Sequence, residues 1–196
     1  MKKLMLAMTL VALAGCSRFH TTDARIGEGQ MTTAVTVQPS TSIAALKGYK
    51  FGDSVKPLLA VEAEVRAALN SPDGGHAIAA QLCTLLGPDS TRDAKDFACR
   101  QLWFVASEDN IGAIAPLLSN ADTSDMARYA LEKVSSDDVD DALIDALATA
   151  PDSAKIGIIN SLVARGNGEG IKAVKQQAKS GSPEVAAAAK AALAGH

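Results

Sequence analysis

Residues 94–118 read AKDFACRQLWFVASEDNIGAIAPLL and carry the clearest fold signal in the chain. Two apolar segments, each long enough for one short helix, lie on either side of the polar turn Ser107-Glu108-Asp109. Helices are favoured over strands because alanine and leucine, both strong helix formers, dominate the apolar positions. The stretch therefore predicts two helices joined by a short turn.

A five-residue motif from this stretch, which we call the phrase, recurs along the chain. Residues 98–102 (ACRQL) match residues 127–131 (ARYAL), and residues 158–162 and 189–193 fall in phase with them. Each phrase closes on a leucine, and these leucines lie roughly 30 residues apart: Leu102, Leu131, Leu162 and Leu193. Other apolar segments end about half a period earlier, at Leu85-Leu86, Leu117-Leu118 and Ala146-Leu147. A fixed period of paired helices is typical of a solenoid, because stacking buries the apolar faces that no single pair can cover.

Turn and capping residues mark the expected helix boundaries from about residue 44 onward. Gly, Pro, Asp and Ser recur between the apolar segments, as in Ser71–Gly75 and Ser180–Pro183. Residues that can accept hydrogen bonds from the first helical N–H groups stand at the expected starts: Thr91, Thr123 or Ser124, Asp137, Asp152 and Ser182. We therefore predict an all-α fold, an α-solenoid of about four to five helix pairs over residues 44–196.

Composition limits the function classes. The chain has 196 residues, 47% of them hydrophobic and only 4% aromatic, which suits one domain of tightly packed helices. Its net charge of -3 gives no basic excess for binding phosphates, so we expect no nucleic-acid partner. Three His and three Cys leave little material for a metal site.

The N-terminus has the pattern of an export signal. Lys2 and Lys3 precede an apolar stretch from Leu4 to Ala12, which is too short to span a bilayer. The next residues, Leu13-Ala14-Gly15-Cys16, resemble the lipobox of bacterial lipoproteins. The resemblance implies a signal peptide over residues 1–15 and a lipid-modified Cys16 in the bacterial cell envelope. Because Ser17 rather than Asp follows, it further implies the outer membrane and a domain that faces the periplasm.

Residues 16–43 are predicted to form a flexible linker behind the lipidated cysteine. The stretch is rich in Ser, Thr and Gly and shows no sustained helical period. A weak alternation over residues 33–38 leaves a short strand open as the other interpretation.

The repeats resemble a known family. Their period is shorter than that of ordinary HEAT units and is similar to the compact HEAT-like repeat of phycobilisome lyases. Residues 94–118, residues 126–132 and the opening YKFGDS at residues 49–54 resemble a bacterial HEAT-repeat domain of planctomycete-type genomes. The resemblance covers residues 44–196 and implies a scaffold for an unidentified protein partner. In such arrays the second helices line the concave face, which implies a partner-binding face with these residues: Arg100, Trp103, Tyr129 and Asn160.

Two interpretations of that face stay open. Exposed Arg, Tyr and Trp are favoured binding anchors, but Trp103 and Tyr129 are equally suited to packing between repeats. No hydrolase or metalloprotease motif is found, so we expect no enzyme, no cofactor and no small-molecule substrate. One alternative is an accessory subunit that docks on a periplasmic redox enzyme; a bilin lyase is suggested only by the namesake of the repeat.

Other candidate groups have plain structural interpretations. Cys83 and Cys99 fall on neighbouring helices, where they form either a disulfide or two buried thiols. In the run from Asp137 to Asp145, the first two aspartates suit a helix N-terminus and the others a solvated face. Residues 166–170 (GNGEG) are expected to form a turn between repeats, and Lys172, Lys175 and Lys179 a charged solvated face.

Overall fold

The computed structural model describes residues 39–195, and every regular element in this range is helical. The predicted all-α class is therefore confirmed for this part of the chain. Cys16, the predicted signal peptide and nearly all of the predicted linker lie outside it. The α-helices are α1 (Thr41–Ala44), α2 (Lys56–Ala68), α3 (His76–Cys83), α4 (Arg92–Val105), α5 (Ile111–Ile114), α6 (Ser124–Leu131), α7 (Asp137–Thr149), α8 (Asp152–Arg165), α9 (Gly168–Ser180) and α10 (Pro183–Ala194). The 3₁₀ helices are η1 (Thr84–Leu86), η2 (Glu108–Asn110) and η3 (Ala115–Ser119).

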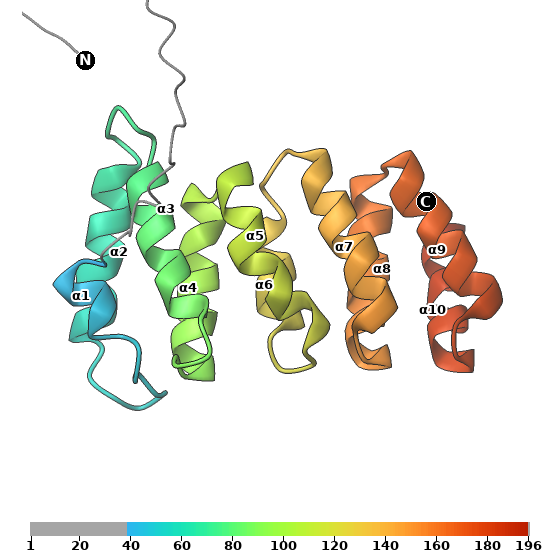
Figure 1. The fold of residues 1–196 in the computed structure, drawn as a ribbon, viewed down its shortest axis with the longest axis horizontal. Helices are drawn as coiled ribbons and strands as arrows, with labels where there is room; N and C mark the ends of the chain where they lie inside the picture. The colour runs from blue at the N-terminus through green and yellow to red at the C-terminus, as the bar shows by residue number, and fades with distance from the viewer. Residues whose placement is uncertain (1–38, 196) are drawn as a thin grey trace, which may run out of the picture. The chain divides into compact units, whose positions relative to one another are not determined.

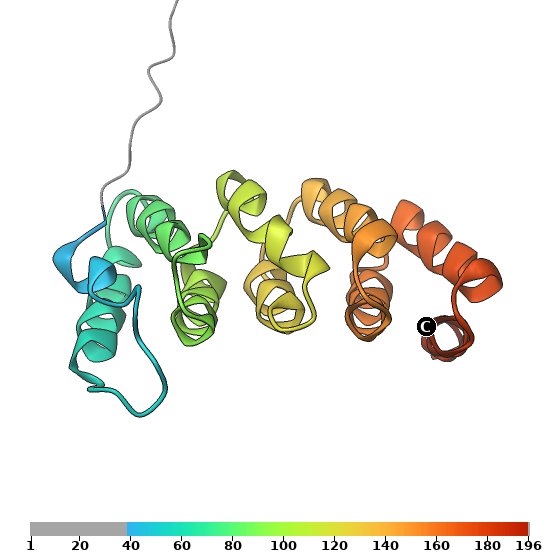
Figure 2. The same cartoon turned by 60° about the horizontal axis from the view of Figure 1, so that its bottom comes forward.

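From α3 onward the helices form two layers, which Figures 1 and 2 show from two sides. The first layer contains α3, α5, α7 and α9, and the second contains α4, α6, α8 and α10, with α2 beside α4. Each first-layer helix packs on the second-layer helix that follows it in sequence, which makes four pairs within residues 76–194. Second-layer neighbours also pack directly, α4 on α6, α6 on α8 and α8 on α10. This arrangement is compatible with a repeat array.

The recurring leucines lie between these pairs. Leu102, Leu131 and Leu162 are at most 1% exposed, because each is covered by its own pair and by the neighbouring pairs. Leu193 is only partly buried, since no helix follows α10 among residues 39–195. Alanines of the same phrases, such as Ala98 and Ala127, are fully buried and let second-layer helices approach closely.

The helical part starts earlier than the sequence predicts. The linker was expected to reach residue 43, but Ser40 already caps α1 by accepting a hydrogen bond from the Ile43 N–H. Ile43 is fully buried, and Ser40 bonds to Glu64 of α2 and Gln81 of α3. The sequence around Ser40 does not indicate this boundary, because the residues that Ser40 bonds to are more than twenty positions away in the chain.

Capping agrees with the sequence at some helix starts and differs at others. Thr91 and Ser182 accept hydrogen bonds from Ala94 N–H and Val185 N–H, as predicted. At α7 the cap is Ser136 rather than Asp137, which joins the first turn. At α8, Pro151 holds the cap position and Asp152 lies in the first turn, where the helix dipole favours its charge.

No helix within residues 39–195 combines the length and the apolar composition needed to cross a membrane. The longest of them, α4 and α8, have 14 residues each.

A buried ion pair joins the start of α7 to the end of α8. Arg165 donates from Nε to Asp140 Oδ1 at 2.8 Å and from a terminal nitrogen to Oδ2 at 3.1 Å. The same guanidinium also donates to the carbonyls of Val134 and Ser136. The expectation of a solvated face was therefore wrong for Asp140, whose side chain is only 5% exposed, while Asp141 and Asp145 are exposed.

We expect Asp140→Ala to lower the free energy of unfolding by about 3 kcal/mol, because it leaves the Arg165 charge partly buried without its carboxylate. The measurement is the midpoint and slope of urea unfolding followed by circular dichroism. Asp141→Ala is the matched control, since that exposed neighbour should change stability by no more than about 0.5 kcal/mol. Equal midpoints for the two variants would show that the ion pair does not hold α7 to α8.

Candidate functional site

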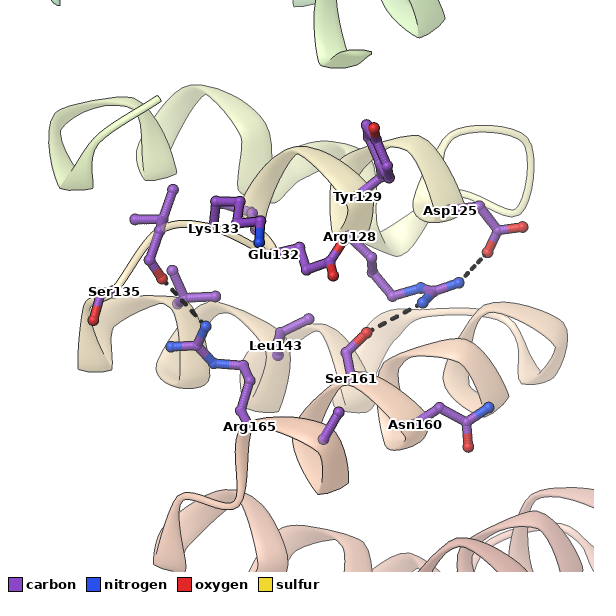
Figure 3. A pocket seen from close by; sticks show the side chains of 14 residues that line it. Asp125, Arg128, Tyr129, Glu132, Lys133, Ser135, Leu143, Asn160, Ser161 and Arg165 are labelled. Atoms are coloured by element: carbon purple, nitrogen blue, oxygen red, sulfur yellow. Dashed lines mark hydrogen bonds and ion pairs between the residues drawn. The ribbon is translucent and has the colours of Figure 1, made fainter. Parts of the chain in front are cut away.

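A groove with a volume of about 880 Å³ lies between the second-layer helices α6 and α8. We call it the α6–α8 groove, and Figure 3 shows its side chains. One wall comes from α6 and the segment that follows it, and the other comes from α8, with the start of α7 between them. The lining includes both apolar and charged side chains, among them Arg128, Tyr129, Glu132, Lys133, Asn160 and Arg165.

Arg128 crosses from α6 to α8 inside the groove. Its guanidinium donates to Ser161 Oγ at 3.1 Å and pairs with Asp125, one turn back on α6. It lies so close to α8 that a Cβ atom added to Gly157 would be 2.6 Å from a terminal nitrogen of Arg128. Because Gly157 has no side chain, the Arg128 guanidinium can lie directly against the backbone of α8.

The Arg128 guanidinium is not fully satisfied. Its Nε is buried and finds no hydrogen-bond partner within residues 39–195. Buried polar atoms without partners are rare, because each forgoes the hydrogen bond that water would have supplied. Arg128 therefore differs from an ordinary surface arginine, because part of its guanidinium group is buried in the groove without a hydrogen-bond partner.

An aromatic cluster lies next to the groove and bridges α4 and α6. The rings of Trp103 and Tyr129 stack with centroids 5.8 Å apart and planes 15° from parallel. Phe104 meets Trp103 edge-on at 4.9 Å. Phe104 is 53% exposed and Tyr129 is 42% exposed, so the cluster packs between α4 and α6 and also presents apolar surface to solvent.

Two charged residues fix the Trp103 ring. Lys133 Nζ lies 5.0 Å from the ring centroid, within the range of a cation–π contact. The indole N–H is 3.4 Å from a carboxylate oxygen of Glu132, to which it donates. Both residues follow α6 and line the α6–α8 groove, so the aromatic cluster and the groove share one rim.

The structure places the sequence-predicted residues on three successive second-layer helices. Tyr129 and Asn160 line the same groove from α6 and α8, and Trp103 on α4 contacts Tyr129. Arg100 is also on α4, exposed and paired with Asp96 at 2.9 Å, and it is not part of the groove lining. Cys16 lies outside the described residues.

Sequence reasoning missed several residues of this face. Phe104 follows Trp103 in an apolar run that looks like core, and only the orientation of α4 shows it to be exposed. Arg128 lies inside a recurring phrase, and its partner Ser161 is 33 residues away. Gly157 did carry a usable signal, because glycine inside a helical pattern often marks a close approach.

The two cysteines in the described range are free thiols. Burial raises the pKa of the Cys83 thiol to about 11, against an ordinary value of 9.0. Burial, with the Asp96 carboxylate as a smaller contribution, raises the pKa of Cys99 to about 12. Since the thiolate is the reactive form, neither cysteine is a prepared nucleophile.

The other charged candidates lie on the surface. Lys172 pairs with Glu169 at 3.2 Å, and Lys175 and Lys179 are exposed on the same helix. Gly166 ends α8 in the left-handed conformation and Asn167 caps α9, so the predicted turn is confirmed for these two residues. The prediction was wrong for residues 168–170, which form the first turn of α9. Among residues 39–195 there is no group of three or more His, Cys, Asp or Glu residues that could hold a metal ion.

We expect Gly112→Ala to stabilise the fold by about 0.5–1 kcal/mol, because alanine is the better helix former and the new Cβ would be clear of other described atoms. Gly157→Ala should gain clearly less, because its Cβ pushes Arg128 away from Ser161 and loses about 1 kcal/mol of hydrogen bonding. Urea unfolding of both variants measures the difference. An equal gain at the two positions would mean that Arg128 contributes nothing at its place on α8.

We expect Cys83 to react with iodoacetamide at pH 8 roughly 100-fold more slowly than a free thiol, because a pKa raised from 9.0 to about 11 leaves far less thiolate, and Cys99, with a pKa of about 12, to react more slowly still. The chain should carry Cys16→Ser so that only these two thiols report. The rate is read by mass spectrometry, with the guanidinium-unfolded protein as the reference. Fast labelling of the folded protein would show that the thiols are not buried in solution.

Comparisons of this chain with family models, with curated proteins and with solved structures found no match. The functional conclusion therefore depends on the geometry of the α6–α8 groove and the aromatic cluster.

Proposed function

We propose that this protein is a lipid-anchored scaffold of HEAT-like repeats that binds a protein partner through the surface formed by α4, α6 and α8, which we call the second-layer face. The observation that carries the proposal is the aromatic cluster, in which Phe104 and Tyr129 remain about half exposed beside a groove of about 880 Å³. Exposed aromatic rings next to a concave surface are typical of the residues that supply most of the binding energy at interfaces.

The second-layer face is prepared for binding before a partner arrives. Trp103 is held by stacking on Tyr129, by the Lys133 cation and by the Glu132 carboxylate. Arg128 is held by Ser161 and Asp125. Side chains that are already ordered lose little rotamer entropy on association, which leaves more of the contact energy as affinity.

The solenoid, the anchor and the location belong to the same proposal. The two-layer packing of four pairs and the recurring leucines support an α-solenoid of HEAT-like repeats. The LAGC sequence that ends at Cys16 supports lipid modification in a bacterial envelope, with the domain facing the periplasm from the outer membrane. A diacylated cysteine would hold the repeats at the membrane, where a periplasmic partner can reach the second-layer face.

We propose binding rather than catalysis at this face. The groove is lined by Arg128 and Arg165, whose charges are engaged by Asp125 and Asp140, and by the amide of Asn160. Nucleophilic catalysis would need an activated nucleophile with a base in reach, and the two thiols with raised pKa are elsewhere, on α3 and α4. The mixture of aromatic, amide and charged side chains suits a polypeptide surface.

The test is photocrosslinking in living cells with a probe at Asn160 on the groove and a matched probe at Asp141 on the exposed side of α7. We expect one discrete adduct from position 160 and none from position 141. Phe104→Ala should weaken that adduct by tenfold or more, because a central aromatic contact contributes about 2 kcal/mol.

The identity of the crosslinked protein decides between a general scaffold and an accessory subunit of a redox enzyme. An adduct from position 141 alone, or an adduct at 160 that Phe104→Ala does not weaken, would contradict binding through the second-layer face.

A further inference from the structure

The segment between α1 and α2 presents the most exposed apolar side chains of the described residues. Phe51 is 93% exposed, Val55 is 54% exposed and Leu59, one turn into α2, is 55% exposed. We call these three residues the apolar tip. Figures 1 and 2 show their segment, at the blue end of the described chain, as a loop that extends beyond the ends of the neighbouring helices. The apolar tip thus belongs to this loop and to the first turn of α2, and it lines none of the α6–α8 groove.

The exposure of Phe51 is built into the loop by hydrogen bonds. The Phe51 N–H donates to Asp93 at 2.9 Å, and the Lys50 N–H donates to Asp53 at 2.8 Å. Gly52 takes a φ of 100°, which a residue with a side chain rarely adopts. Thr91 ties the loop base to the rest of the fold through the carbonyls of Lys47 and Tyr49. A loop held this firmly keeps Phe51 in water, where an exposed large apolar side chain gives up the stabilisation of burial.

The charges around the apolar tip favour an anionic surface. Lys50 and Lys56 flank it, both exposed and without an ion-pair partner among residues 39–195. Lys47 is paired with Asp89 and Arg92 with Asp93, while the carboxylate of Asp53 accepts the Lys50 N–H. The tip therefore carries a small local positive charge on a chain whose net charge is -3.

We propose that the apolar tip and its two lysines insert into the surface of an anionic phospholipid bilayer. A projecting phenylalanine with lysines around it is suited to the interfacial region, where the ring enters the acyl boundary and the ammonium groups meet lipid phosphates. An anionic leaflet attracts each such lysine.

The inference rests on the proposed anchor at Cys16, which would keep the tip close to lipid. The described chain begins 23 residues after Cys16, and that length spans about 80 Å when extended, so the anchor permits the contact. A single acyl or apolar contact holds a protein only weakly at a membrane, but two signals on one chain reinforce each other. The tip would thus set which end of the repeats meets the lipid.

The experiment places a tryptophan at the apolar tip of the mature chain, residues 16–196, as Phe51→Trp with Trp103→Phe, and uses the mature chain with Trp103 alone as the matched reporter. Both chains lack the predicted signal peptide and carry Cys16→Ser, so the result depends neither on an apolar N-terminal segment nor on lipidation or the α6–α8 groove. Vesicles of phosphatidylcholine with or without phosphatidylglycerol, and with brominated acyl chains, are the probe. We expect blue-shifted and strongly quenched emission from position 51 on the anionic vesicles and unchanged emission from Trp103.

Lys50→Gln and Lys56→Gln should each lower the ratio of inserted to free tips about fivefold on anionic vesicles. Lys190→Gln, at an exposed position on α10, is the control and should leave the ratio unchanged. The proposal is overturned if position 51 does not respond to lipid, or if Trp103 responds equally. It is also overturned if emission from position 51 is already blue-shifted without vesicles, because another part of the chain or a second copy then covers the tip.

Discussion

The whole arrangement depends on the fact that one pair of short helices cannot cover its own apolar face. Leu102, Leu131 and Leu162 are buried because another pair stands on each side of them, and Leu193 is only partly buried because α10 is the last helix described. Burial is therefore shared between neighbouring pairs, whose buried side chains form one continuous hydrophobic cluster from Ile43 to Ala189. The buried alanines of the second layer also help to cover these faces, since their small side chains let α4, α6, α8 and α10 pack directly on one another.

Two arginines connect this packing to the candidate site. Arg165 fixes the end of α8 to the start of α7, and Arg128 fixes α6 to α8. Both guanidinium groups contact the α6–α8 groove, so the interactions that join these helices also shape the groove. The aromatic cluster has the same double role one helix pair earlier, because Trp103 and Tyr129 pack α4 on α6 while Phe104 stays exposed.

Much of the fold could be predicted from the sequence, because the helix positions follow from the local spacing of apolar and turn residues. The leucine spacing and the turn residues located the helices of residues 76–194, and Thr91 and Ser182 cap helices as expected. Contacts that join distant residues were not predictable. In the sequence, Asp140 cannot be told apart from the other aspartates of its acidic run, because its partner Arg165 is 25 residues later in the chain. Of the candidate site, the sequence indicated Tyr129, Trp103 and Asn160 but not Arg128 or Gly157, whose roles exist only once α6 lies on α8.

The contacts of Ser40 have a mechanical consequence. Ser40, the second of the described residues, bonds to Glu64 on α2 and Gln81 on α3, so a pull on the N-terminus would be divided between two helices at once. Such a pull would load α1, α2 and α3 before it reached the α6–α8 groove, because the contacts of Ser40 are made with these first helices.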